Sequence, residues 1–202
     1  MNKNSTLEKI IDGLKWFAKS YIWVMILLLG LDILSKQLTQ HCLWNGPYET
    51  GYSDCVTVIP NFFYIRVLFN TGAAWGSFDG NRIFLISISL IAAILFIFYL
   101  VWKWKKLAVI YRAALYLMIP GCIGNLIDRA FYRQGVIDFL EFHFGSYIFP
   151  TFNFADAFLV CGVIVLLIGL LYEDYIKPKR EIKKVNQSKS GNSQDEEDSS
   201  QE

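Results

Sequence analysis

The sequence predicts a mainly α-helical membrane protein with four transmembrane helices, short β-strands and an interfacial segment on the outer face. Three observations support this fold class. Hydrophobic residues make up 54% of the 202 residues and charged residues only 18%, which is unlike a soluble domain. Four apolar stretches approach or exceed the roughly 20 helical residues that cross a bilayer. Lysine and arginine gather on one side of these stretches, as in proteins that follow the positive-inside rule.

The first predicted element lies before the first apolar stretch. Residues 1–20 repeat apolar side chains at helical spacing opposite several lysines, so we expect an amphipathic helix at the cytoplasmic membrane interface. The apolar stretch that follows leads into Asp32 and Lys36 rather than into a cleavage site made of small residues. We therefore expect a permanent transmembrane helix and not a cleavable secretory signal.

The four predicted spans cover residues 21–38, 83–102, 107–127 and 155–172. Basic residues precede the first span, fill the connection between the second and third, and follow the fourth. The asymmetry predicts a multi-pass protein of the cytoplasmic membrane with both termini in the cytoplasm. The connections after the first and third spans then face outward. The charged, apolar-poor segment 173–202 is expected to be a disordered cytoplasmic tail.

The outward segments differ in composition. Residues 56–70 are rich in β-branched and aromatic side chains with partial alternation, which predicts short strands on the membrane surface. Residues 129–153 are aromatic throughout and suit the headgroup region. Cys42 and Cys55 both lie in an outward segment and can form a disulfide in an oxidising exterior, but the sequence leaves their state open. Because the cysteines lack CxxC spacing and histidine partners, we expect no metal site.

Polar residues that lipid should not tolerate lie at the outward ends of the first, third and fourth predicted spans, and Asn70 and Asp138 are tethered to the same side by a few residues. Ionisable residues at a membrane boundary are a functional hypothesis, because only pairing or water offsets their cost. Five separate segments of the chain converge on this layer, and the candidates are Asp32, Lys36, Asn70, Gly72, Asn125, Asp128, Arg129, Asp138, Asn153 and Asp156.

Several of these candidates also have a purely structural interpretation. Asp32 and Lys36 are one helical turn apart and can form a neutralised pair that fixes helix packing. Asn153 and Asp156 have the spacing of a helix N-cap. Gly72 can mark a tight turn. These interpretations stay open at the level of the sequence.

Asp138 is not explained in this way, because it lies between apolar neighbours and caps no predicted helix. Asp156 begins a helix 18 positions later, so the loop can bring the two carboxylates together. Two close carboxylates in a poorly hydrated site cannot both ionise, so one keeps a proton near neutral pH. That is the arrangement required for aspartic protease chemistry.

Two other classes of function compete with this hypothesis. A small proton-coupled transporter also uses membrane carboxylates, as proton relays. We would expect its carboxylates to be distributed through the bilayer depth, with interruptions in mid-helix. A noncatalytic membrane scaffold would tolerate replacement of Asp138 by Asn.

The chain resembles the lipoprotein signal peptidases, also called signal peptidase II, which are four-span aspartic proteases of the bacterial cytoplasmic membrane. Five motifs carry the resemblance in family order: DILSK, FNTGAAWG, GNLIDR, VIDF and FNFAD. It covers residues 21–172, which we expect to form the four-span aspartic peptidase domain. The resemblance implies cleavage of prolipoproteins on the amino side of a cysteine that carries diacylglycerol, with Asp138 and Asp156 as the catalytic pair.

The resemblance also implies roles for the other candidates. Asn70, Gly72, Asn125, Asp128, Arg129 and Asn153 would shape the site or hold the substrate, and Asp32 with Lys36 would support it. The motif that contains Asp128 makes this residue a rival for the catalytic role, but its position at a helix end next to Arg129 favours a structural salt bridge. We expect lipidated prolipoproteins and membrane lipids as partners, no nucleic acid, no cofactor and a monomeric protein. Trp75 and Gly76 stand where the family more often has phenylalanine and serine, and residues 41–55 have no assigned role.

Overall fold

The computed structural model describes residues 20–44, 52–72 and 80–176, together with Glu8, residues 11–13 and Lys15. Most of the predicted interfacial helix 1–20, the tail after residue 176 and the Ala73 to Gly76 part of FNTGAAWG lie outside the described residues. Their predicted roles stay predictions.

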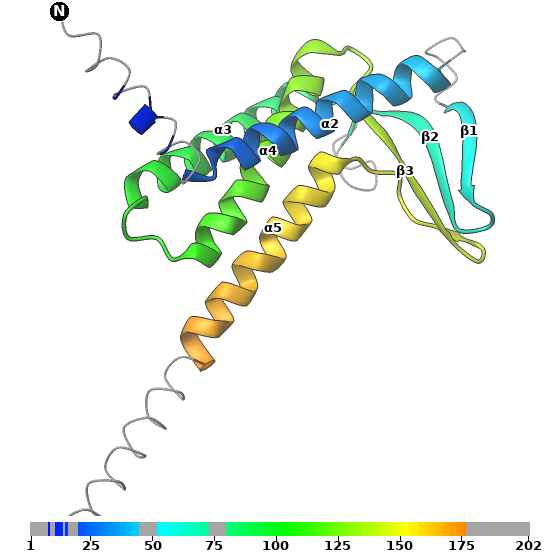
Figure 1. The fold of residues 1–202 in the computed structure, drawn as a ribbon. Helices are drawn as coiled ribbons and strands as arrows, with labels where there is room; N and C mark the ends of the chain where they lie inside the picture. Colours follow the sequence, from blue (N-terminus) through cyan, green and yellow to red (C-terminus); the bar gives the residue numbers. More distant parts are fainter. Residues whose placement is uncertain are drawn as a thin grey trace, which may run out of the picture.

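Four long helices form the bundle shown in Figure 1: α2 (Ile22–Leu43), α3 (Arg82–Lys103), α4 (Val109–Phe131) and α5 (Phe154–Leu171). All four are long and apolar enough to cross a membrane, which confirms the four predicted spans. The first helix continues past its predicted end at residue 38, because its polar outer residues contain no glycine or proline that would end a helix. A short π-helix, η3 (Tyr172–Ile176), follows α5.

Helix α4 is the centre of the bundle and packs against the other three helices. Its contact with α5 is close because glycines lie at the interface. A Cβ atom on Gly121 would overlap the main chain of Ala155, and one on Gly162 would overlap Met118. Small residues of this kind let the main chains of transmembrane helices approach each other. The approach brings the C-terminal half of α4 against the first turn of α5.

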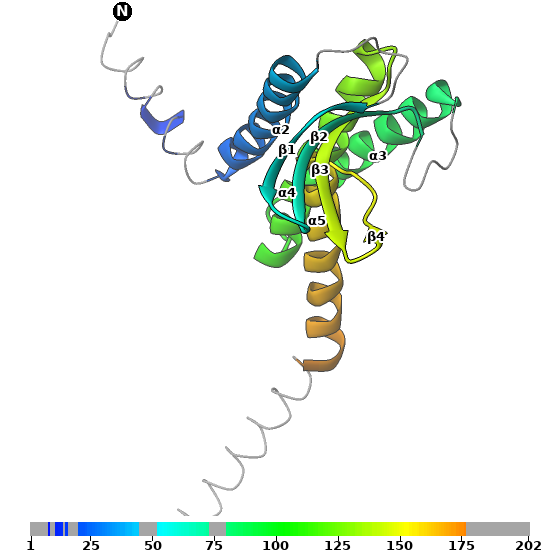
Figure 2. The ribbon, with the colours of Figure 1, turned by 90° about the vertical axis from the view of Figure 1, so that its right-hand side faces the viewer.

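An antiparallel sheet lies at one end of the bundle, in the order β1 (Tyr52–Ile59), β2 (Phe63–Asn70), β3 (Val136–Phe144) and β4 (Tyr147–Ile148). Figure 2 shows β1, β2 and β3 in front of the helices. The first two strands confirm the strands predicted in residues 56–70, whereas β3 was not predicted. The β2–β3 register pairs Leu68 with Asp138 and Asn70 with Val136, so the sheet brings two candidate residues together.

Cys42 and Cys55, for which the sequence allows a disulfide, are not joined. Cys42 at the end of α2 and Cys55 in β1 are both exposed free thiols in the structure. The disulfide that the sequence left open is therefore not formed in this structure.

Candidate functional site

The centre of the site is Asp138, which β3 holds at the junction of the sheet and the helices. Its side chain is buried, and both carboxylate oxygens accept a hydrogen bond. The Asn70 side-chain amide donates to Oδ2 at 2.9 Å and the Asn153 side-chain amide donates to Oδ1 at 2.7 Å. The carboxyl group is thus fixed from both sides by neutral donors.

The second carboxylate, Asp156, lies in the first turn of α5. Asn153 is the N-cap of this helix: its Oδ1 accepts from the Asp156 backbone N–H at 3.0 Å, and Asp156 Oδ2 accepts from the Asn153 backbone N–H at 3.2 Å. The predicted cap is therefore confirmed as a reciprocal capping box. Asp156 Oδ1 takes no part in the cap and accepts from the Asn125 side-chain amide at 2.7 Å. Capping thus leaves one oxygen of Asp156 directed into the site.

Asn153 connects the two carboxylates. Its side-chain nitrogen, fully buried, donates to Asp138 and also lies 3.1 Å from Asn125 Oδ1 and 3.3 Å from the Ile137 carbonyl oxygen. The same residue binds Asp156 through its main chain and its Oδ1. One residue therefore fixes the relative position of a strand carboxylate and a helix carboxylate that are 18 positions apart in sequence.

The electrostatic environment of Asp138 favours its protonated form. Burial in the protein, followed by the negative charge of Asp156, raises the pKa of Asp138 from its ordinary 3.8 to about 8, against the opposing effect of the Asn70 hydrogen bond. Desolvation and a nearby like charge act in the same direction on a carboxylic acid. Both causes favour the carboxylic acid form of Asp138 over the carboxylate at neutral pH.

Lys36 of α2 is joined to this pair through Asn125, and its ammonium group lies among three oxygen atoms. Its ammonium nitrogen is 2.8 Å from Asp32 Oδ2, 2.9 Å from Asp128 Oδ2 and 3.1 Å from Asn125 Oδ1. The Lys36 and Asp32 side chains are 0% exposed. The predicted neutralised pair of Asp32 and Lys36 is thus present, but it is extended by a second carboxylate.

Asp128 forms the structural salt bridge that the sequence predicted, and its partner is Lys36 rather than the adjacent Arg129. Asp128 pairs with Lys36 and also accepts a hydrogen bond from the Ile137 backbone N–H at 3.3 Å. Consecutive residues on a helix do not face each other, so Asp128 and Arg129 point to different neighbours. Asp128 instead ties α4 to α2 and to the start of β3.

Asp32 also acts on α5. Its Oδ1 accepts from the Ala155 backbone N–H at 2.8 Å, in the helical turn that carries Asp156. Asp32 reaches this position past Gly124, where a Cβ atom would overlap its carboxylate. The buried charges of α2 therefore hold the first turn of α5 in place.

A third branch of the network leads from Asn70 to Arg129. Asn70 Oδ1 accepts from the Gly72 backbone N–H at 3.0 Å, and the Arg129 guanidinium donates to the Gly72 carbonyl at 3.3 Å. Every candidate from the sequence thus belongs to one connected network of hydrogen bonds and ion pairs, made of Asp32, Lys36, Asn70, Gly72, Asn125, Asp128, Arg129, Asp138, Asn153 and Asp156.

Two residues that shape this network were missed at the level of the sequence. Gly135 has a positive φ of 101°, and a Cβ atom there would overlap the main-chain carbonyl of Asn70. Arg82, at the start of α3, donates to the carbonyl oxygens of Arg129 at 2.6 Å and Ala130 at 3.0 Å. Arg82 thereby provides hydrogen-bond donors for the carbonyl groups at the C-terminal end of α4. The sequence could have indicated this role, because a basic residue in a segment predicted to face outward is contrary to the charge asymmetry.

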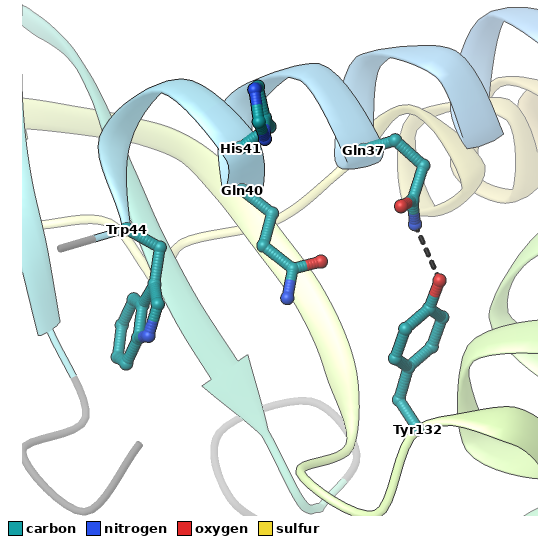
Figure 3. Close-up of a pocket in the computed structure, with 5 residues that line it drawn as sticks. All are labelled: Gln37, Gln40, His41, Trp44 and Tyr132. Atoms are coloured by element: carbon teal, nitrogen blue, oxygen red, sulfur yellow. Dashed lines mark hydrogen bonds between the residues drawn. The ribbon is translucent and has the colours of Figure 1, made fainter. Parts of the chain in front are cut away.

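The residues that the structure describes include no group of three His, Cys, Asp or Glu that could hold a metal ion. A hollow of about 360 Å³ lies between the C-terminal end of α2 and Tyr132. Figure 3 shows Gln37 of α2 donating to the Tyr132 hydroxyl across it, at 2.6 Å. None of the ten network residues lines this hollow, so the chemistry of the carboxylates lies elsewhere.

Comparison with known proteins agrees with this geometry. The family model described as signal peptidase (SPase) II matches residues 24–172. A lipoprotein signal peptidase of Clostridium tetani is 40% identical over 150 residues, covering 74% of this chain and 93% of the relative. One of Bacillus pumilus is 39% identical over 153 residues, covering 76% and 93%. A bacterial membrane enzyme structure, determined by the in meso method at 2.3 Å resolution, is 30% identical with a TM-score of 0.67 and covers 79% of this chain and 92% of that chain.

These similarities do not support the alternative of a proton-coupled transporter, since the matching family consists of proteases. They agree with a multi-pass bacterial membrane protein that has four apolar helices. The match of the family model to most of the chain, together with the network at the junction of α4, α5 and β3, shows that the chain belongs to the signal peptidase II family.

Proposed function

We propose that this protein is an aspartic endopeptidase that removes the signal peptide from diacylglyceryl-modified prolipoproteins, cleaving on the amino side of the lipidated cysteine. Asp138 and Asp156 are its catalytic pair. The observation that carries the proposal is the shared residue Asn153, which hydrogen-bonds to both carboxyl groups. Membership of the signal peptidase II family supports the substrate class.

The two carboxyl groups take different roles. Asp156 carries the negative charge, which is stabilised by the Asn125 amide, by the Asn153 N–H and by its place at a helix N-terminus. It removes a proton from a water molecule, whose oxygen forms the new bond to the scissile carbonyl carbon. Asp138, protonated at neutral pH, donates its proton to the developing oxyanion.

Collapse of the gem-diol intermediate completes the reaction. The C–N bond breaks and the proton held by Asp156 passes to the leaving amine. One hydroxyl of the intermediate becomes the new carbonyl and returns its proton to Asp138. The pair thereby returns to its singly protonated state, as in other aspartic proteases. The reaction uses no group other than water and these two residues.

Other residues of the network position the pair or receive the substrate. The buried Nε of Arg129 has no hydrogen-bond partner among the described residues, so it is available to a carbonyl of the peptide substrate. Asn70 and Asn153 keep Asp138 in a fixed orientation. Asp32, Lys36 and Asp128 lie behind them and act as positioning residues.

We also propose an orientation of the protein in the membrane. Both termini lie in the cytoplasm, the catalytic pair lies near the outer leaflet, and residues 21–172 form the peptidase domain as a monomer in contact with membrane lipids. The lysine asymmetry of the chain supports this orientation. A catalytic pair at the outer boundary of the bilayer meets a substrate whose acyl chains lie in that leaflet.

The test is cleavage of a purified prolipoprotein by the full chain in detergent, with the products identified by mass spectrometry. A matched substrate without diacylglycerol is the control. We expect a product that begins with the lipidated cysteine and a much lower rate for the unmodified control. Cleavage at another bond, or no cleavage by folded protein, would contradict the proposal.

A further inference from the structure

A second hollow lies between α3, α4 and α5, in the half of the bundle away from the sheet. Its volume is about 570 Å³. The helices line it with large apolar side chains. Leu95, Phe98 and Trp102 of α3 and Leu170 of α5 are exposed, and Met118 of α4 is buried. We call this hollow the inner groove. Figure 1 shows its three helices running away from the sheet together.

The inner groove has one charged residue at its far end. Glu173 of η3 is the single charged side chain among the described residues that line the groove. Its Oε2 accepts a hydrogen bond from the Tyr111 hydroxyl at 2.8 Å. Tyr111 belongs to α4 and lines the groove too, so the carboxylate is held at the groove's end rather than left to rotate in water.

The groove is at the right depth for part of a signal peptide. Leu166 is ten residues after Asp156 along α5, and Glu173 is seventeen residues after it. At 1.5 Å per helical residue these positions are about 15 Å and 25 Å from the catalytic pair. A signal peptide has an apolar region of about 7–15 residues preceded by a basic one. A helix cut at its outer end would therefore have its apolar region beside the groove and its basic region near Glu173.

We propose that the inner groove holds the apolar helix of the substrate's signal peptide and that Glu173 pairs with the basic residues at that peptide's start. The inference rests on the proposed function, because it takes the cleavage site to lie at Asp138 and Asp156. Charge complementarity selects this occupant. A carboxylate at the cytoplasmic edge repels the anionic headgroups of that leaflet and attracts a basic peptide.

The opposite side of the groove mouth is basic, which indicates on which side the basic part of the peptide binds. Lys103 lies with its ammonium group 4.0 Å from the centre of the Trp102 ring, and Trp102 lines the groove on the α3 side. Lys105 and Lys106 follow in the same turn. A basic peptide segment is therefore directed to the α5 side of the mouth, where Glu173 lies.

Steady-state kinetics test the charge contact. Two diacylglyceryl-modified substrates are compared, with two lysines or two glutamines at the start of the signal peptide. An exposed ion pair changes affinity by a factor of about 1.4 to 5, so Glu173→Gln should raise KM for the lysine substrate about two- to fivefold. Glu173→Lys should raise it further. We expect kcat to stay unchanged, and KM for the glutamine substrate to change in neither variant.

A matched control and a binding assay complete the test. Asp12→Asn removes another exposed carboxylate, on the segment before α2, and should leave both KM values unchanged. A photo-crosslinking residue replaces either Leu170 in the groove or Leu27, an exposed residue of α2 that does not line it. With Asp138→Asn in both proteins, uncleaved signal peptide should crosslink at position 170 and not at position 27.

The outcomes separate this inference from the proposed function. Equal KM values for wild type and both Glu173 variants would overturn the charge contact. Crosslinks from position 170 to lipid only, or to a second copy of the enzyme, would overturn the docking. Failure of the wild type to cleave either substrate would refute the proposed reaction instead, and the crosslink would still decide the docking because it requires no cleavage.

Discussion

Replacement of Lys36 by Met should unfold the protein at a much lower temperature. The substitution keeps the volume of the side chain but removes a buried cation that lies 2.8 Å from Asp32 and 2.9 Å from Asp128. Breaking a buried ion pair by removing one partner costs about 3–5 kcal/mol. At about 2–4 °C per kcal/mol for a chain of this size, the melting temperature should fall by roughly 6–20 °C.

The assay is thermal unfolding of the purified protein in detergent, followed by intrinsic tryptophan fluorescence. Lys15→Met is the matched control, because Lys15 is 67% exposed and 3.7 Å from Asp12. Its loss should change stability by less than about 1 kcal/mol. Asp32→Asn in the Lys36→Met background should recover part of the loss, since one uncompensated charge is removed. An unchanged melting temperature with abolished cleavage would refute the reasoning and assign Lys36 to the chemistry.

Three further predictions concern the carboxylate pair. The pKa of Asp138 is raised from 3.8 to about 8 in the folded protein, so the stability that this residue contributes is present below about pH 4 and is lost as the pH rises to about 8. The melting temperature of the wild type should therefore fall over this pH range relative to that of Asp138→Asn. A difference in melting temperature between the two proteins that does not depend on pH would contradict the prediction. Gly135→Ala should abolish most cleavage by displacing Asn70, whereas Gly145→Ala, also at positive φ but with open space around its Cβ position, should cost only about 1–2 kcal/mol of stability. Asn153→Ser keeps an N-cap residue but loses the amide that binds Asp138, so kcat should fall at least about tenfold while the melting temperature changes little. An unchanged kcat with a lower melting temperature would show that Asn153 acts only as a cap.

The transmembrane helices could be predicted from the sequence because the bilayer sets their length and composition. Strands β1 and β2 followed from β-branched and aromatic residues. Strand β3 could not be found in this way, because Val136, Ile137 and Phe139 are all buried and residues on both of its faces are covered. A strand buried on both faces does not alternate between apolar and polar residues. The strand that carries Asp138 was thus predicted as a surface segment.

The members of the candidate site could be predicted, but several of their contacts could not. The spacing of Asn153 and Asp156 identified the capping box, since a cap is local in sequence. The partner of Asp128 is 92 positions away at Lys36 and depends on how α2 packs against α4. The need for glycine at position 135 depends in the same way on a neighbour from another strand, Asn70.

The central claim is that Asp138 and Asp156 together cleave the peptide bond, and the most direct measurement is single-turnover cleavage of a diacylglyceryl-modified prolipoprotein by Asp138→Asn and Asp156→Asn. Melting curves establish that each variant is folded, and Asp12→Asn serves as the control. Each substitution should abolish cleavage while the substrate still binds. Cleavage at the wild-type rate by either variant would show that the pair is not catalytic.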